Sequence, residues 1–157
     1  STQEVAQNVN ELSAGLLSLG LSAHNFSPEG SDKIAVISTN RPEWLFADMA
    51  AQQLGLIWVP VYPTTNPLEL TFILNDASVQ YIFASNQELY DKVMSIKDKV
   101  DCLKDIYTFD KIPGAKHWTE LKSKDENLLQ QVMIKSVKNE TLNLSTTVVI
   151  IVLVAQV

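Results

Sequence analysis

Two consecutive strand–helix units constrain the fold of this chain more than any other feature of its sequence. Both lie within residues 32–77, and each begins with a short apolar run, at 34–37 and at 56–61. Such runs are typical of strands buried in a parallel sheet. Each run is followed by residues that predict a capped helix start. These residues are Asn40, Pro42 and Glu43 in the first unit and Asn66, Pro67 and Glu69 in the second.

Apolar residues recur at helical spacing after each start, so each helix should turn one face toward the core. Gly55 stands where the first helix should end. Pro60 lies inside the second strand and has no N–H group, so we expect that strand to end early or to place Pro60 at an unpaired position. The expected core positions are Phe46, Met49, Ala50 and Leu54 in the first helix and Leu70, Ile73, Leu74 and Ala77 in the second.

The same alternation extends over the rest of the chain as far as residue 109. Apolar residues from Val5 to Leu19 predict a long amphipathic helix that ends at Gly20. Further strands are expected at 79–84 and 103–109, and capping boxes at Ser1 with Glu4 and at Ser85 with Glu88. The sequence therefore predicts an α/β fold with an open, doubly wound and mostly parallel sheet and flanking helices.

The chain is expected to form a single α/β domain over residues 1–138. A linker and an apolar terminal strand should follow over 139–157, where the tail reads VVIIVLVAQV from residue 148. After the turn at Pro113 and Gly114, residues 116–138 are charged and weakly helical. Their expected anchors are Trp118, Leu121, Leu128, Leu129 and Val132.

At residues 40–44 and 59–64 the chain reads NRPEW and VPVYPT, and these motifs carry a resemblance to a known family. The sequence resembles the N-terminal region of acyl-CoA synthetases, the fatty-acid–CoA ligases of the adenylate-forming superfamily. The likeness runs from about Val5 to Phe109 and favours the long-chain branch over the coumarate, luciferase and peptide-synthetase branches. Further matching residues lie at 32–37, 47–48, before Gly55 and at 73–76.

The resemblance implies a parent enzyme that joins a fatty acid to coenzyme A, with ATP and Mg²⁺, through an acyl-adenylate. In this family the next apolar strand leads into a Gly-, Ser- and Thr-rich phosphate loop that ends in Pro-Lys-Gly. Here residues 148–151 could be that strand, but residues 152–157 replace the loop, and no glycine follows Gly114. We therefore expect a truncated or frame-shifted piece of the N-terminal subdomain that is inactive and binds none of these cofactors.

Individual side chains give little sign of chemistry. Arg41 follows a strand and precedes a helix, where α/β folds bind anions, but a role in fixing the turn is favoured. Cys102 is interpreted as a half-buried apolar residue and His24 as a solvated loop residue. No catalytic, cofactor-binding or metal-binding residue is assigned. Asp48, Glu69 and Asp76 are interpreted as helix-surface and cap residues, and Trp44 and Trp58 as packing residues.

Composition limits the partners and the compartment. The net charge of −6 gives no reason to expect nucleic-acid binding. One cysteine excludes an internal disulfide and suits a reducing compartment, so we expect a cytoplasmic protein, with peripheral membrane contact of the parent left open. The apolar run at 148–155 is too short to cross a bilayer.

Two alternatives from other classes stay open. One is a non-catalytic interaction module that forms a homodimer by pairing its exposed terminal strand with a second chain. The other is a flavodoxin-like domain that binds a small ligand at the strand ends formed by residues 38–40 and 62–65.

Overall fold

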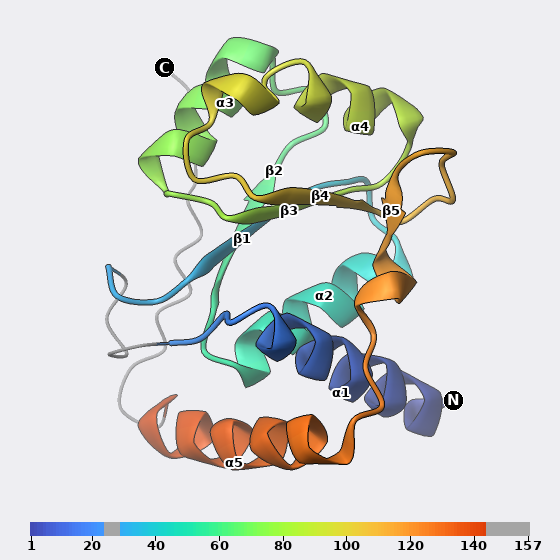
Figure 1. The fold of residues 1–157 in the computed structure, drawn as a ribbon, viewed down its shortest axis with the longest axis vertical. Coiled ribbons are helices and arrows are strands. Elements are labelled where there is room, and N and C mark those ends of the chain that lie inside the picture. Colours follow the sequence, from blue (N-terminus) through green and yellow to red (C-terminus); the bar gives the residue numbers. More distant parts are fainter. Residues whose placement is uncertain (24–28, 144–157) are drawn as a thin grey trace.

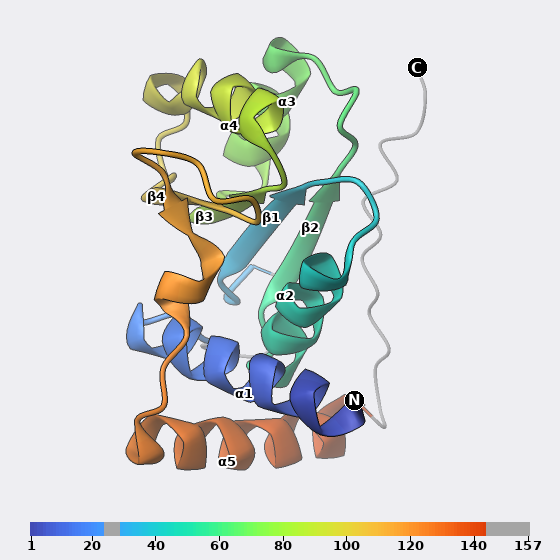
Figure 2. The same ribbon diagram turned by 90° about the vertical axis from the view of Figure 1, so that its right-hand side faces the viewer.

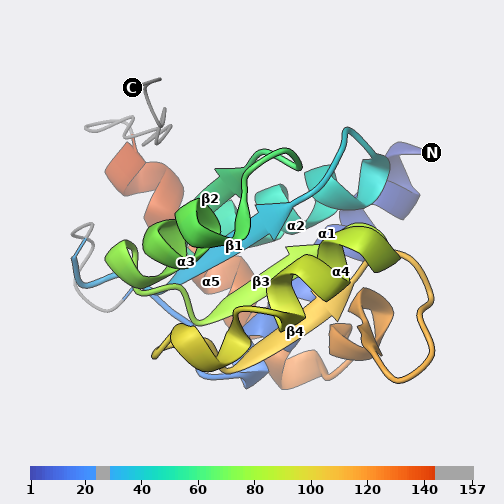
Figure 3. The same ribbon diagram turned by 90° about the horizontal axis from the view of Figure 1, so that it is seen from above.

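A computed structural model describes residues 1–23 and 29–143, with the side chains of 139–143 left out. Its centre is a five-stranded, all-parallel sheet in the order β2-β1-β3-β4-β5, which confirms the predicted α/β class (Figure 3). The direction of strand order reverses between β1 and β3. The strands are β1 (Lys33–Ile37), β2 (Ile57–Val61), β3 (Tyr81–Ala84), β4 (Asp105–Thr108) and β5 (Lys116–His117).

Helices cover both faces of the sheet, as the doubly wound prediction requires (Figure 1). On one face lie α1 (Thr2–Ser18) and α2 (Pro42–Gln53), and α5 (Glu126–Asn143) packs beneath α1 as an outer layer (Figure 2). The other face carries α3 (Pro67–Asp76) and α4 (Gln87–Met94). Two short 3₁₀ helices are η1 (Lys97–Lys99) and η2 (Trp118–Leu121). Across the described ranges, no helix is long and apolar enough to span a membrane.

Each face of the sheet has its own hydrophobic core. Side chains alternate along β1, so Ile34 and Val36 join the core under α1 and α2, whereas Ala35 and Ile37 join the core under α3 and α4. All four residues are fully buried. A strand covered on both sides explains why its sequence is an unbroken apolar run rather than an alternating one.

The helix starts were predicted with mixed success. Asn66 caps α3 as expected, because its side chain accepts the Glu69 N–H at 2.9 Å. Asn40 does not cap α2. The N-cap position belongs to Arg41, whose backbone is extended because Pro42 follows it, so Asn40 lies one residue outside the helix.

The start of α4 also differs from the prediction by one residue. Asn86 is the N-cap and accepts the Leu89 N–H at 3.0 Å. Ser85 is instead held by the sheet, since its N–H donates to the carbonyl of Ile37 at 3.2 Å. The backbone ladder thus continues one residue beyond β3 and moves the cap along the chain.

The core face of α2 is narrower than its apolar residues suggested. Ala50 and Leu54 are buried as predicted, but Met49 is 40% exposed. Its expected place is taken by Ala47 and Ala51, which are fully buried where α2 approaches α1. Small side chains let the two helices come close together, and that close approach turns Met49 outward.

Pro60 lies at the free edge of the sheet, as one of the two predicted arrangements required. Among the strands of residues 1–23 and 29–143, β2 pairs with β1 alone. Ile57 donates its N–H to the carbonyl of Asp32 at 2.9 Å, so it points toward β1. Because successive residues of a strand point their N–H groups to opposite edges, the missing N–H of Pro60 falls on the open side.

The chain after β4 holds more structure than the sequence indicated. The turn at Pro113 and Gly114 forms with φ +81 at Gly114, and it leads into the unpredicted β5 and η2. The expected anchors Trp118, Leu121 and Val132 are buried. α5 continues past the boundary expected at Lys138, and the apolar strand expected from residue 148 lies outside the described residues.

The segment after β5 crosses α1 at very close range. Gly15 faces the backbone of Leu121, and a Cβ on Gly15 would overlap the Leu121 carbonyl. Nearby, Lys122 pairs with the buried carboxylate of Glu11 at 3.0 Å. These contacts join the first helix to the last third of the described chain.

Gly15→Ala should therefore lower the free energy of unfolding by at least about 2 kcal/mol, because overlap with backbone outweighs the better helix propensity of alanine. Gln3→Ala, at an exposed position of the same helix, is the control and should change it by less than about 0.5 kcal/mol. Urea denaturation followed by circular dichroism measures both. An unchanged or raised midpoint for Gly15→Ala would contradict the close approach.

Candidate functional site

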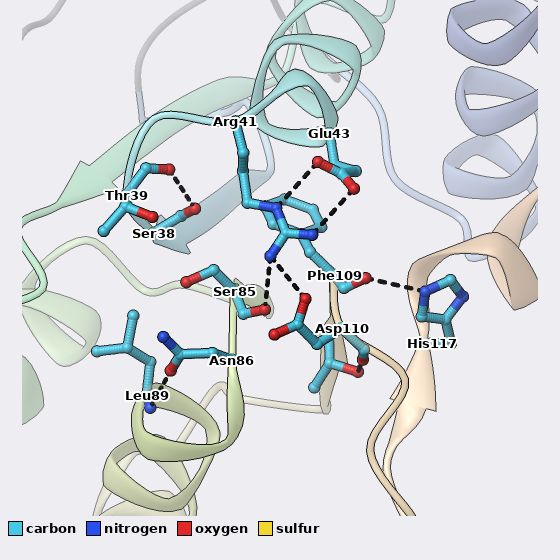
Figure 4. Close-up of polar contacts among 11 residues, drawn as sticks. Ser38, Thr39, Arg41, Glu43, Ser85, Asn86, Leu89, Phe109, Asp110 and His117 are labelled. Carbon is cyan, nitrogen blue, oxygen red and sulfur yellow. Dashed lines mark hydrogen bonds and ion pairs between the residues drawn. The ribbon is translucent and has the colours of Figure 1, made fainter.

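Polar residues gather where β1, β3 and β4 end, at one edge of the sheet (Figure 4). Open α/β sheets bind ligands outside the carboxyl ends of their strands, at the point where the strand order reverses. Here that point lies between β1 and β3. This edge is therefore the candidate functional site of the described chain.

Arg41 connects all three strand ends. Its Nε and Nη2 donate to the two carboxylate oxygens of Glu43, at 2.9 and 3.0 Å. Its Nη1 donates to the carbonyl of Ser85, after β3, at 3.0 Å and to Asp110, after β4, at 2.8 Å. The guanidinium carbon also lies 5.5 Å from the ring centroid of Phe109. Arg41 thus directs hydrogen bonds from all three of its nitrogens at protein groups.

Local sequence explains how the guanidinium reaches this position. Pro42 keeps Arg41 extended and starts α2, which brings Glu43 into the first turn beside it. The hydrogen bonds to Glu43, and next those to Asp110, raise the pKa of Arg41 even though burial opposes them. In return, the hydrogen bond from Arg41 lowers the pKa of Glu43 against the opposing effect of burial.

His117 borders the same edge from β5. Its Nε2 lies 2.9 Å from the carbonyl of Phe109 and must donate to it, because a carbonyl only accepts. Its Nδ1 lies 2.6 Å from the hydroxyl of Thr119. Both ring nitrogens are therefore committed to neighbouring protein groups. A shallow hollow of about 390 Å³ lies beside this histidine, lined by Lys111, Ile112, Pro113, Ala115, Thr119 and Glu120.

Ser85 carries a buried hydroxyl at the reversal point. The residue is 1% exposed, and its Oγ has no hydrogen-bond partner in the described structure. On the β1 side, the Ser38 hydroxyl donates to the carbonyl of Thr39 at 2.6 Å. Figure 4 shows these hydroxyl groups from β1 and β3 on the same side of the Arg41 guanidinium.

Sequence reasoning singled out Arg41 but missed Ser85 and Asp110 as its hydrogen-bond partners and His117 at the same edge of the sheet. A usable signal was present for two of them, since Ser85 and Asp110 directly follow predicted strands. In a parallel sheet all such positions meet at one edge. His117 gave no such signal, because β5 has two residues and no apolar run.

The loop after β2, proposed as half of a ligand site, is held by α4. Lys92 donates from its ammonium group to the carbonyls of Pro63 and Thr65, at 2.6 and 3.1 Å. Tyr62 at the start of this loop is exposed. Residues 38–40 and 62–65 do follow neighbouring strands, β1 and β2, as that alternative expected.

The remaining candidates do not gather into a site. Cys102 is exposed rather than half-buried, between η1 and β4. Asp48 accepts from Gln52 on the surface of α2, and Glu69 and Asp76 are exposed on α3. Trp44 and Trp58 pack edge to face with centroids 5.9 Å apart. His24 lies outside the described residues, and within the described ones no three His, Cys, Asp or Glu side chains could hold a metal ion.

Comparison with known proteins decides the family. A model of the AMP-binding enzyme family matches residues 1–151. The chain belongs to the AMP-binding enzyme family. This membership agrees with the resemblance read from residues 40–44 and 59–64 and extends it toward the end of the chain.

Relatives of this AMP-binding chain include proteins named as acyl-CoA synthetases and as fatty-acid–CoA ligases. Fatty acyl-CoA synthetase A of Dictyostelium discoideum is 26% identical over 115 residues, which is 73% of this chain and 16% of that protein. Long-chain-fatty-acid–CoA ligase 6 of Mus musculus is 33% identical over 79 residues, 50% of this chain and 11% of that ligase. The chain thus spans about a sixth or less of these relatives.

Solved structures share the fold. The anthranilate CoA ligase AuaEII, in complex with anthranoyl-AMP, superposes with a TM-score of 0.65 at 20% identity, over 76% of this chain and 21% of that one. A luciferase-like enzyme from the mealworm Zophobas morio gives 0.67 at 21% identity, over 81% and 28%. The fold of this AMP-binding chain is therefore that of adenylate-forming ligases.

Arg41→Ala should lower the free energy of unfolding by about 2–3 kcal/mol, because it leaves Glu43 and the Ser85 carbonyl partly buried without their donor. Asp110→Asn should cost less than about 1 kcal/mol, since Asp110 is half exposed. Lys99→Ala, at an exposed position, is the control. Denaturant titrations measure the loss of unfolding free energy in each of the three variants. Equal losses for Arg41→Ala and Lys99→Ala would contradict the stabilising role of Arg41.

Acid should weaken the fold through Glu43. Its folded-state pKa is lowered, so its contribution is present above the unfolded pKa of about 4.3 and is lost as the pH falls through the folded value. Glu43→Gln should therefore flatten the loss of unfolding free energy below about pH 4.5. In an Arg41→Gln background the same change should have little further effect. An equal flattening in both backgrounds would show that Arg41 is not the cause.

Proposed function

We propose that this chain forms part of an ATP-dependent fatty acid–CoA ligase that activates its acid as an acyl-adenylate. The match of the AMP-binding enzyme model to residues 1–151 carries the proposal. The names of the relatives support a fatty acid as substrate, and the name of the mouse ligase supports a long-chain one. In such a reaction the carboxylate of the fatty acid attacks the α-phosphate of ATP and displaces pyrophosphate, and the thiol of coenzyme A then attacks the acyl carbonyl of the adenylate and displaces AMP. A bound Mg²⁺ would supply positive charge to offset that of the phosphates.

We propose that the described residues supply little of the site for Mg²⁺ and ATP in the parent enzyme. Within 1–23 and 29–143 no group of three metal-binding side chains comes together. Arg41, the one arginine of the sequence, is bound to Glu43, Ser85 and Asp110. We therefore assign this part of the chain a structural role. In it, β1, β3 and β4 form a surface on which the remaining parts of the ligase pack.

The isolated chain should neither bind ATP tightly nor form a thioester. Residues 152–157 contain no glycine, serine, threonine or lysine to hold a triphosphate. Incubation with ATP, Mg²⁺, a long-chain fatty acid and coenzyme A, followed by chromatography for acyl-CoA, should show no product. Clear ATP-dependent acyl-CoA formation would overturn this assignment.

The natural reading frame distinguishes the ligase from other functions. Sequencing the transcript through and past the codons for residues 145–157 should reveal a Gly-, Ser- and Thr-rich stretch that ends in Pro-Lys-Gly. A stop codon directly after Val157 would refute ligase activity for this protein. In that case the inactive chain would have to act by binding.

A non-catalytic binding domain is the second candidate, and the strand order β2-β1-β3-β4-β5 favours it. This order is also that of flavodoxin-like domains, which bind their ligand at the reversal point. Bound flavin colour, or a ligand-induced rise in melting temperature, would support it. The strand-paired homodimer depends on the apolar segment from residue 148, which lies outside the described residues, and it stays a prediction.

A further inference from the structure

α5 forms an outer layer of the described fold. It packs on α1 and α2, and these two helices separate it from the sheet (Figure 2). Among the side chains described for residues 126–138, Val132 alone is buried, and Leu128 and Leu129 are half-buried in the same core. Residues 34–37 of β1 are by contrast all fully buried. Segments with few buried apolar contacts open at a lower free energy than core strands, so α5 should open before the sheet does.

The chain before α5 is anchored to the rest of the fold at η2. Trp118 and Leu121 are buried, and the ring of Trp118 lies 6.0 Å from that of Phe46 on α2. The carbonyl of Leu121 also lies directly against Gly15 on α1. Residues 122–125, which we call the strap, then lead from η2 to α5. A movement of α5 away from α1 would therefore pivot just after Leu121.

Lys122 fastens the strap to α1 next to this pivot. Its ammonium group lies 3.0 Å from the carboxylate of Glu11 and donates to the side-chain carbonyl of Asn8 at 2.8 Å. The same group lies 5.7 Å from the ring centroid of Trp118. One residue further along, the N–H of Ser123 donates to the backbone carbonyl of Glu11 at 2.9 Å. The strap is thus held by a concentrated set of polar bonds to one turn of α1.

The burial of Glu11 makes release of the strap an all-or-none event. The Glu11 side chain is buried in the closed arrangement, where a charge without its partner is strongly disfavoured. Once the strap has left, water reaches both Glu11 and Lys122, and neither needs the other. The ion pair therefore stabilises the closed arrangement alone, and a half-released strap is disfavoured.

We propose that the strap and α5 form a detachable layer, which leaves α1 as one unit while the sheet, η2 and the other helices stay folded. The Lys122–Glu11 ion pair is the latch of this layer. Opening exposes Leu128, Leu129 and Val132 together with the part of the core that they cover. The latch thus sets how often this apolar surface meets solvent.

Hydrogen exchange followed by NMR tests the layer. An isolated helix of this length and mixed sequence is weakly formed in water, so the amides of α5 exchange once it leaves α1. Amides of residues 130–138 should be about a hundredfold less protected than those of 33–37, and their exchange should depend less on dilute urea, because less surface is exposed. Equal protection and equal urea dependence of the two sets would overturn the proposal. So would protection that declines evenly toward the ends of α5.

Two variants separate opening of the layer from unfolding of the sheet. Lys122→Ala should raise the exchange rates of α5 amides by about tenfold, because a hydrogen bond to a charged group is lost from the closed form only. Ile82→Val, in the core on the other face of the sheet, should raise those of β1 amides by about fivefold. It should leave α5 unchanged, since the contacts of Ile82 persist when the layer opens. Equal acceleration of α5 and β1 in Ile82→Val would overturn the detachable layer.

Two further variants test the latch itself. Asn8→Ala keeps the ion pair, removes the second acceptor of Lys122 and should speed exchange of α5 by about threefold. Lys124→Ala, at an exposed position of the strap, is the matched control and should change it by less than about twofold. Unchanged exchange of α5 in both Lys122→Ala and Asn8→Ala would overturn the latch. Equal effects of Lys122→Ala and Lys124→Ala would overturn it as well.

Discussion

β1 is the strand on which the rest of the structure depends. It is hydrogen-bonded to β2 along one edge and to β3 along the other, and its last four residues are fully buried on both faces. Every backbone group of such a strand must be satisfied within the sheet, because water cannot reach it. The register of β2 and β3 against β1 therefore fixes where the neighbouring loops emerge.

Arg41 and the groups that accept its hydrogen bonds form a clamp across the strand ends, and the position of this clamp follows from that register. The strand ends of β1 and β3 are brought level by their pairing, and one side chain can then bridge from β1 to the ends of both β3 and β4. Two carboxylates offset the single positive charge, and Phe109 shields one face of the guanidinium. The edge at which α/β proteins bind ligands is thus stabilised here by contacts within the protein itself.

Much of the fold could be predicted because buried strands and capped helices leave local marks. The runs at 34–37, 56–61 and 79–84 and the Asn66 cap became β1, β2, β3 and α3. The errors arose where contacts between distant segments determine the orientation of a side chain or the presence of a strand. Met49 faces outward because α1 approaches the alanines of α2, and β5 is short and gave no pattern. The neighbours of Arg41 come from positions 44 and 69 residues away, a proximity that a single sequence does not display.

The use of a single arginine at this clamp has a practical consequence. All other cationic side chains of the chain are lysines or histidines, so a guanidinium-selective dicarbonyl reagent has one side chain to modify. That side chain is mostly covered in the closed strand ends, and its reaction would require them to separate. The rate of such labelling would therefore serve as a covalent reporter of local opening at one edge of the sheet, read without altering the sequence.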